Sequence, residues 1–168
     1  MENRDAPLEV EIAEHIRARM IGSNVPGAAV GVVRDGERIF AETFGSANIE
    51  TGSPVVETSA FQAGSVGKQF TAAGIMLLVE DGKLKLDDPI ARIITEAPAK
   101  WQKITARHLL THSSGIPDYT SDRFDYRKDY TDEELVQMAK ELELEFEAGA
   151  RWNYSNTGYV LLGIITTR

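Results

Sequence analysis

Cysteine is absent from this sequence of 168 residues, and so is any long apolar run. Without cysteine the chain has no disulfide, no thiolate nucleophile and no thiolate metal site, although this does not fix the cellular compartment. No stretch approaches the roughly 18 to 20 apolar residues of a membrane-spanning helix. The N-terminal segment MENRDAPLEVEIAEH has no apolar signal core, so the sequence as written predicts a cytoplasmic protein without a membrane span. A mature periplasmic or secreted form is compatible with the same sequence.

Positive charge is also scarce. The chain has 18 Lys and Arg against 26 Asp and Glu, which gives a net charge of -8. Nucleic acids and anionic membranes require a basic face, so neither is expected as a partner, whereas a small-molecule substrate remains open. With 42% hydrophobic and 26% charged residues the composition is that of a soluble globular protein, and the length suits one domain. We expect no cofactor.

Strand patterns are few and lie near the start of the chain. Residues 27–33 and 38–44 flank Asp35-Gly36, a pair suited to a tight hairpin turn because it tolerates positive φ. Before them, residues 8–21 predict an amphipathic helix with a core-facing apolar stripe. The stripe has one member every four residues: Leu8, Ile12, Ile16 and Met20.

The rest of the chain has helical patterns. Residues 65–81 form one of them, and Gly82 is well placed as its C-terminal cap. Shorter helices are predicted from their N-terminal signals, which are Asp88-Pro89, Thr105, the capping box of Thr131 and Glu134, and Ser155. Two strands followed by helices indicate an α+β fold.

The segment QAGSVGKQF places Ser65 and Lys68 three residues apart, which makes them neighbours on one face of a helix. Ser65 stands at the predicted helix start, where free backbone N–H groups favour developing negative charge. The apolar run FTAAGIMLLV behind Lys68 favours burial, and burial near a helix N-terminus favours the neutral amine. A neutral amine beside a hydroxyl is a general base beside a nucleophile. By spacing alone, a helix cap beside a surface lysine fits as well.

A second candidate is the segment NYSNTGY, in which Tyr154 and Asn156 flank Ser155 where a loop enters a helix. A phenol can relay protons, and an amide can hold a carbonyl and a lysine together. By itself the triplet also fits a buried aromatic residue, a capping serine and a turn asparagine.

Three segments in this order, SVGK, ITARHLLTHSSGIPDY and RWNYSNTGYVLLG, resemble the serine β-lactamase and penicillin-binding-protein superfamily. More narrowly, they resemble its class C β-lactamase, esterase and D-alanyl-D-alanine-peptidase branch, which pairs Ser-x-x-Lys with Tyr-x-Asn where class A enzymes use Ser-Asp-Asn. The resemblance runs from about residue 25 to the end. It implies a serine hydrolase that forms an acyl-enzyme with an amide or ester: a β-lactam, a D-amino-acid peptide or a short-chain ester.

The resemblance also implies a role for each matching residue. Ser65 matches the acylated nucleophile, whose own N–H is one oxyanion-hole donor, and Lys68 with Tyr154 matches the pair that relays its proton. Tyr154 would also help to activate the deacylating water. Asn156 would orient Lys68 and the carbonyl of the substrate. The HLLTHSSGIPDY segment is a structural signature to which we transfer no catalytic role.

One departure from the family pattern is severe. The third motif, Lys-Thr-Gly or His-x-Gly on a later strand, is absent, and no Lys-x-Gly or His-x-Gly occurs in the chain. We therefore expect one partial domain over 1–168: a sheet-side segment at about 8–60, then the nucleophile helix and helical subdomain over 61–168, without the C-terminal sheet strands. The alternative is a non-catalytic remnant, or a fragment that needs a complementing segment. Uncovered apolar surface in such a chain would favour self-association.

Two other interpretations are weaker. AGSVG nearly fits the nucleophile elbow of the α/β-hydrolases, but the preceding segment SPVVETSAFQ is too polar for the buried strand that this elbow needs. His108 and His112 have the i, i+4 spacing of a metal-binding pair, but no Glu-x-x-His pattern or third ligand accompanies them. We expect no metal site, and structural hydrogen bonds for both histidines.

Overall fold

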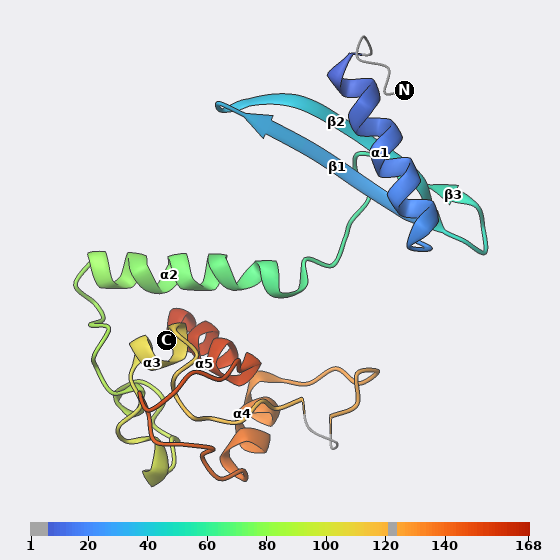
Figure 1. Cartoon of the computed structure of the whole chain (residues 1–168). Helices are drawn as coiled ribbons and strands as arrows, with labels where there is room; N and C mark the ends of the chain where they lie inside the picture. The colour runs from blue at the N-terminus through green and yellow to red at the C-terminus, as the bar shows by residue number, and fades with distance from the viewer. Residues whose placement is uncertain (1–6, 121–123) are drawn as a thin grey trace. The chain divides into compact units, whose positions relative to one another are not determined.

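The computed structural model describes residues 7–120 and 124–168, so residues 1–6 of the N-terminal segment considered above lie outside it. Contacts divide the chain into two compact units, Met1–Gln62 and Ala63–Arg168. The predicted mixture of helices and a few antiparallel strands is confirmed, and all the strands found in the described residues lie in the first unit (Figure 1).

The first unit holds a helix and a small antiparallel sheet. Helix α1 spans Leu8–Gly22, and the strands are β1, Gly27–Arg34, β2, Glu37–Asn48, and β3, Ser53–Pro54, in the order β1-β2-β3. The predicted turn is confirmed, because Asp35 and Gly36 both have positive φ, 53° and 81°. The sequence pattern missed β3, since a strand of two residues is too short to show a period.

Helix α1 packs on one face of the sheet (Figure 1). The buried centre is Ala13, Phe40 and Phe44, and the partly buried residues around it include Ile12, Ile16 and Met20 of the predicted stripe. Leu8, the fourth member of that stripe, is exposed instead. Alternation along β2 explains the two phenylalanines, because residues four apart on a strand point to the same face.

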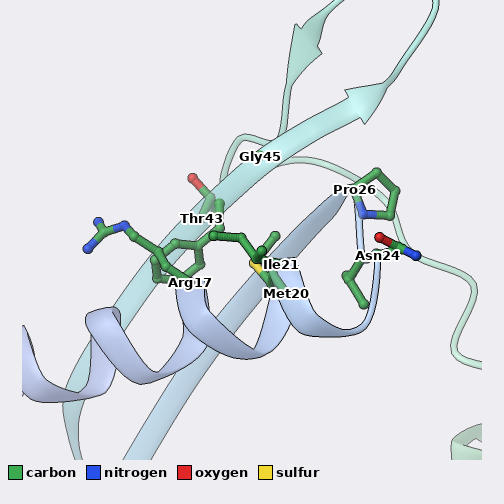
Figure 2. A pocket seen from close by; sticks show the side chains of 9 residues that line it. Arg17, Met20, Ile21, Asn24, Pro26, Thr43 and Gly45 are labelled. Atoms are coloured by element: carbon green, nitrogen blue, oxygen red, sulfur yellow. The ribbon is translucent and has the colours of Figure 1, made fainter.

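A groove of about 720 Å³ lies in this unit between the C-terminal end of α1 and the sheet. Figure 2 shows Arg17, Met20 and Ile21 from α1 and Thr43 from β2 at its wall. The Arg17 guanidinium lies 5.3 Å from the centre of the Phe44 ring and 3.7 Å from the Glu42 carboxylate, so its charge has partners within the unit.

The second unit is helical. Its α-helices are α2, Lys68–Glu80, α3, Ala106–Leu110, α4, Asp132–Lys140, and α5, Asn156–Thr167, and it has 3-10 turns at Gly64–Gly67, Ile90–Arg92 and Ala99–Trp101. The predicted caps at Thr105, Thr131 and Ser155 are confirmed by hydrogen bonds from the backbone N–H three residues on. Gly82 has φ +70°, as its predicted place after α2 requires.

The prediction for Asp88-Pro89 was partly wrong. The short helix exists as the 3-10 turn Ile90–Arg92, but its N-cap is Pro89, one residue later than expected. The Asp88 carboxylate turns back to accept the Lys85 N–H at 3.0 Å, and it accepts from Arg92 on its other oxygen. A short polar side chain can bond either the helix ahead or the turn behind, and the sequence does not decide between them.

Helix α5 is the centre of the second unit, with α2, α3 and α4 packed against it. Its buried side chains include Leu161 and Leu162, and they share one apolar core with Ile75 of α2 and the fully buried Trp101. The further buried members are Leu84, Ile90, Ile94, Ile104, Ala106, Leu109, Ile116, Val136, Ala139, Ile164 and Ile165. Within the described residues, none of the helices is both long and apolar enough to cross a membrane.

Candidate active site

Ser65 lies in the 3-10 turn Gly64–Gly67, which leads directly into α2 at Lys68. The predicted helix start at Ser65 was therefore wrong in detail, because the α-helix proper begins at Lys68. In a 3-10 turn, residues three apart are eclipsed, so the turn keeps the two side chains adjacent. The Lys68 amine donates to the Ser65 Oγ at 3.3 Å.

Tyr154 joins this pair from a position 89 residues along the chain, with its Oη 2.8 Å from the Ser65 Oγ. The Lys68 Nζ also lies 5.0 Å from the centre of the Tyr154 ring and 5.6 Å from that of Tyr159. Interaction with Lys68, and secondly with Ser65, lowers the pKa of the Tyr154 phenol. A more acidic phenol next to a hydroxyl and an amine is suited to passing a proton from one to the other.

Asn156, the first residue of α5, completes the cluster. Its side-chain Oδ1 accepts from the Lys68 amine at 2.6 Å, which holds that amine beside Ser65. All four residues proposed from the sequence thus lie together in the second unit.

Asp118 is a neighbour that the sequence analysis did not identify. Its Oδ2 accepts both the backbone N–H and the side-chain Nδ2 of Asn156, each at 2.8 Å. An amide whose nitrogen is held in this way must turn its oxygen outward, here toward Lys68. No short motif signals this contact, because the two residues are 38 positions apart.

The loop that carries Asp118 is fixed at both of its flanks. Gly115 has φ +76°, and an added Cβ there would lie 2.0 Å from the Phe146 carbonyl oxygen, so only glycine fits. Beyond the aspartate, the Thr157 hydroxyl donates to the Pro117 carbonyl and accepts the Tyr119 N–H, both at 2.8 Å. The HLLTHSSGIPDY segment thus has a structural role, which is to hold the Asp118 carboxylate in position.

Replacing Asp118 by asparagine is expected to slow covalent modification of Ser65 about tenfold to a hundredfold. The new amide keeps one acceptor oxygen where the carboxylate has two, it carries no charge, and its nitrogen faces donors in either orientation. A hydrogen bond to a charged group contributes about 1.5–3 kcal/mol. Rates of labelling by a fluorophosphonate would measure the loss. Thr120→Val is the control, because Thr120 also bonds Asp118 but through the other oxygen. Equal labelling of the Asp118→Asn variant and the unaltered chain would contradict the assignment.

The two histidines of the i, i+4 pair make separate contacts. His108 Nδ1 accepts the Thr105 N–H at 3.3 Å in the capping box of α3. His112 Nδ1 accepts the Ser155 N–H at 3.2 Å, and its ring stacks on Tyr154 with 4.5 Å between the ring centres. Each ring therefore has a backbone hydrogen bond of the kind expected for a structural histidine.

Comparisons with known proteins show to which family the chain is similar. The family model described as Beta-lactamase matches residues 12–168. Penicillin-binding protein 4* of Bacillus subtilis (strain 168) is 39% identical over 135 residues, which are 77% of this chain and 30% of that protein. Esterase EstB of Burkholderia gladioli is 33% identical over 147 residues, which are 77% of this chain and 37% of that protein. The crystal structure of D-amino acid amidase from Ochrobactrum anthropi SV3 complexed with L-phenylalanine matches at 30% identity with a TM-score of 0.81, over 94% of this chain and 44% of that one.

The fold is thus a partial β-lactamase-like fold, of the class found in serine hydrolases. The chain belongs to the Beta-lactamase family, which confirms the resemblance seen in its three motifs. It spans less than half the length of these three relatives.

Proposed function

We propose that this chain carries the nucleophile of a serine hydrolase, and that Ser65 is acylated by an amide or an ester. The observation that carries the proposal is the position of the Ser65 Oγ, 2.8 Å from the phenol of Tyr154 and 3.3 Å from the amine of Lys68. A serine hydroxyl is a weak nucleophile until a base takes its proton, and both neighbours are within reach for that transfer.

The reaction then has two steps. The Ser65 Oγ attacks the carbonyl carbon while its proton passes to the Lys68–Tyr154 pair, and that proton leaves with the amine or alcohol as the old bond breaks. A water molecule next attacks the acyl-enzyme, gives a proton to Tyr154, and releases the acid as the Ser65 hydroxyl is restored. Asn156 keeps Lys68 in place through the 2.6 Å hydrogen bond. The Ser65 N–H, at the entry to α2, would stabilise the oxyanion.

The names of the relatives support the class of substrate. They include a penicillin-binding protein, a β-lactamase, an esterase and a D-amino acid amidase. A β-lactam, a D-amino-acid amide or peptide, and a short-chain ester all present a carbonyl carbon with a leaving amine or alcohol. The Ser65 centre suits each of them, and we propose this group of substrates for the chain.

One observation favours a second candidate for the role of this chain. In that role the chain is a non-catalytic remnant, or a fragment that needs a complementing segment for catalysis. The sequence contains neither a Lys-x-Gly nor a His-x-Gly motif. In the enzymes that this chain resembles, such a motif marks the strand that supplies the second oxyanion-hole donor. Loss of one such donor typically costs about a hundredfold to a thousandfold in rate. Nucleophile activation and full turnover are therefore to be measured separately.

Mass spectrometry after treatment with a fluorophosphonate tests the nucleophile. We expect a single adduct on the peptide that contains Ser65, and no adduct in the Ser65→Ala variant, because this serine lies next to both proposed bases. Ser53→Ala is the matched control, since Ser53 is an exposed serine of the first unit. An adduct on another serine, or the same labelling in Ser65→Ala, would show that the nucleophile is misassigned.

A further inference from the structure

We infer that His112 is a positioning residue for Tyr154, and that it acts only while its imidazole is neutral. The inference rests on the proposed function, because it concerns the phenol proposed to relay the Ser65 proton. His112 acts through its contacts with the Tyr154 ring and with the backbone around it.

The backbone on both sides of Tyr154 is bound by this one residue. The His112 carbonyl oxygen accepts the Asn153 N–H at 2.9 Å, and its Nδ1 accepts the Ser155 N–H at 3.2 Å. Between these two hydrogen bonds the imidazole lies against the Tyr154 ring at 4.5 Å, with 29° between the ring planes. The position of the Tyr154 phenol therefore depends on three contacts with a single residue.

An unusual backbone conformation makes this double contact possible. His112 has φ +55°, one of few non-glycine residues in the described chain with a positive value. Such a conformation is disfavoured for an L-residue and is retained where surrounding contacts hold it. Here it directs the carbonyl and the ring of the same residue toward one segment.

The ring is also held from behind. The Tyr159 ring lies 5.2 Å from that of His112, and the Trp152 ring meets it edge-on at 6.1 Å. The Tyr159 hydroxyl in turn donates to the Leu110 carbonyl at 3.2 Å. The imidazole is thus packed among three aromatic side chains, and a shift of the ring would move Tyr154.

Protonation would break this arrangement. The Ser155 N–H requires a lone pair on Nδ1, so the neutral ring carries its hydrogen on Nε2, and a second proton would turn Nδ1 into a donor. The charged groups that face the ring are Lys68 from α2, which opposes a second positive charge, and Asp118, which favours it, while Tyr154 and Tyr159 border it as phenols. Burial, and after it Lys68, lowers the pKa of His112.

The sign of the pH effect follows from that direction. The pKa of His112 in the folded chain lies below the ordinary 6.5. The contribution of the neutral His112 ring to the free energy of unfolding is therefore fully present above pH 6.5, and it is lost as the pH falls from 6.5 through the folded-state pKa. Over the same range Tyr154 would lose its contacts, so acylation of Ser65 should fall on the acid side.

Nuclear magnetic resonance on the isotopically labelled 168-residue chain tests the contact without any need for catalysis. We expect the His112 ring to show the Nε2–H form at pH 8 and to titrate with a midpoint below 6.5. The Ser155 amide and the Tyr154 ring signals should change with the same midpoint. If either signal stays constant while His112 titrates, the proposal is overturned.

Fluorophosphonate labelling of Ser65 across pH supplies the functional readout. His112→Asn places an acceptor oxygen where Nδ1 was, tolerates positive φ and does not titrate, but it removes the ring stacked on Tyr154. Its labelling rate at pH 8 should therefore fall, but less than that of His112→Ala. The labelling rate of His112→Ala should be lower by up to about a hundredfold, because a displacement of about 1 Å near the reacting atoms has an effect of this size. The acid-side loss at the His112 midpoint should vanish in His112→Asn.

His108→Asn is the matched control, because its ring bonds Thr105 rather than the Tyr154 segment. It should keep the acid-side loss. The same pH profile in His112→Asn and the unaltered chain would overturn the proposal. Absence of any Ser65 adduct in the unaltered chain would instead overturn the proposed function, and the magnetic resonance titration would still decide the contact between His112 and Tyr154.

Discussion

Lys68→Ala and Tyr154→Phe are each expected to slow acylation of Ser65 by about a hundredfold to ten-thousandfold, the range of general acid–base catalysis. The double variant should lose little more than either single one. Both side chains contact the Ser65 hydroxyl, at 3.3 Å and 2.8 Å, so its proton passes through a coupled pair rather than two independent bases. Groups that act as one unit give strongly non-additive losses.

The effect is measured as the rate of single-turnover labelling by a fluorophosphonate. The rates are compared between the unaltered chain, the two single variants and the double variant. Lys83→Ala is the matched control, because Lys83 follows the other end of α2 and pairs with Asp81 at 3.0 Å. Its labelling rate should equal that of the unaltered chain. Losses that multiply in the double variant would show that Lys68 and Tyr154 act separately.

The second large effect concerns an apolar stripe on α2 and the turn before it, formed by Val66, Phe70, Ala73 and Leu77. Phe70 is 72% exposed and Leu77 61% exposed. The members follow one another at intervals of four, three and four residues, so they lie on one helical face. A contiguous exposed apolar face is a site of association, and we expect the 168-residue chain to bind a hydrophobic dye or to self-associate.

Light scattering and dye fluorescence test this prediction. The double variant Phe70→Gln, Leu77→Gln should lose most of the dye signal and become monomeric. Ile21→Gln is the control, because Ile21 is also exposed, at 80%, but belongs to the first unit. A monodisperse chain that binds no dye would show that the stripe is not a site of association.

Turnover by the same chain is expected to be very low, because the sequence has no Lys-x-Gly or His-x-Gly motif. Hydrolysis of nitrocefin and p-nitrophenyl acetate should be no faster than by the Ser65→Ala variant. Turnover that depends on Ser65 would show that these residues suffice for catalysis.

Features that depend on neighbours in sequence were predictable. The caps at Thr105, Thr131 and Ser155 bond the N–H three residues on, and the Asp35-Gly36 turn needs only two positive φ angles. Ser65 and Lys68 belong to the same category, because a separation of three residues makes them adjacent in an α-helix or a 3-10 turn. Errors in this category were local too, such as the 3-10 start before Lys68 and the cap at Pro89.

Of the residues in the assembled cluster, those distant in sequence from Ser65 could be predicted only where the family resemblance named them. Tyr154 and Asn156 were named from a motif, but their contacts with Ser65 and Lys68 span 89 and 88 residues and exist only once α5 packs against α2. Asp118 and His112 were not assigned to the cluster at all. A carboxylate in a turn and a histidine after a helix have no periodic pattern, and their partners are 38 and 43 residues away. The sequence by itself determined which backbone groups are capped and which side chains share one helical turn. Only the tertiary structure decided which distant residues contact Ser65 and Lys68, because apolar packing of α5, rather than any local preference, brings those residues together.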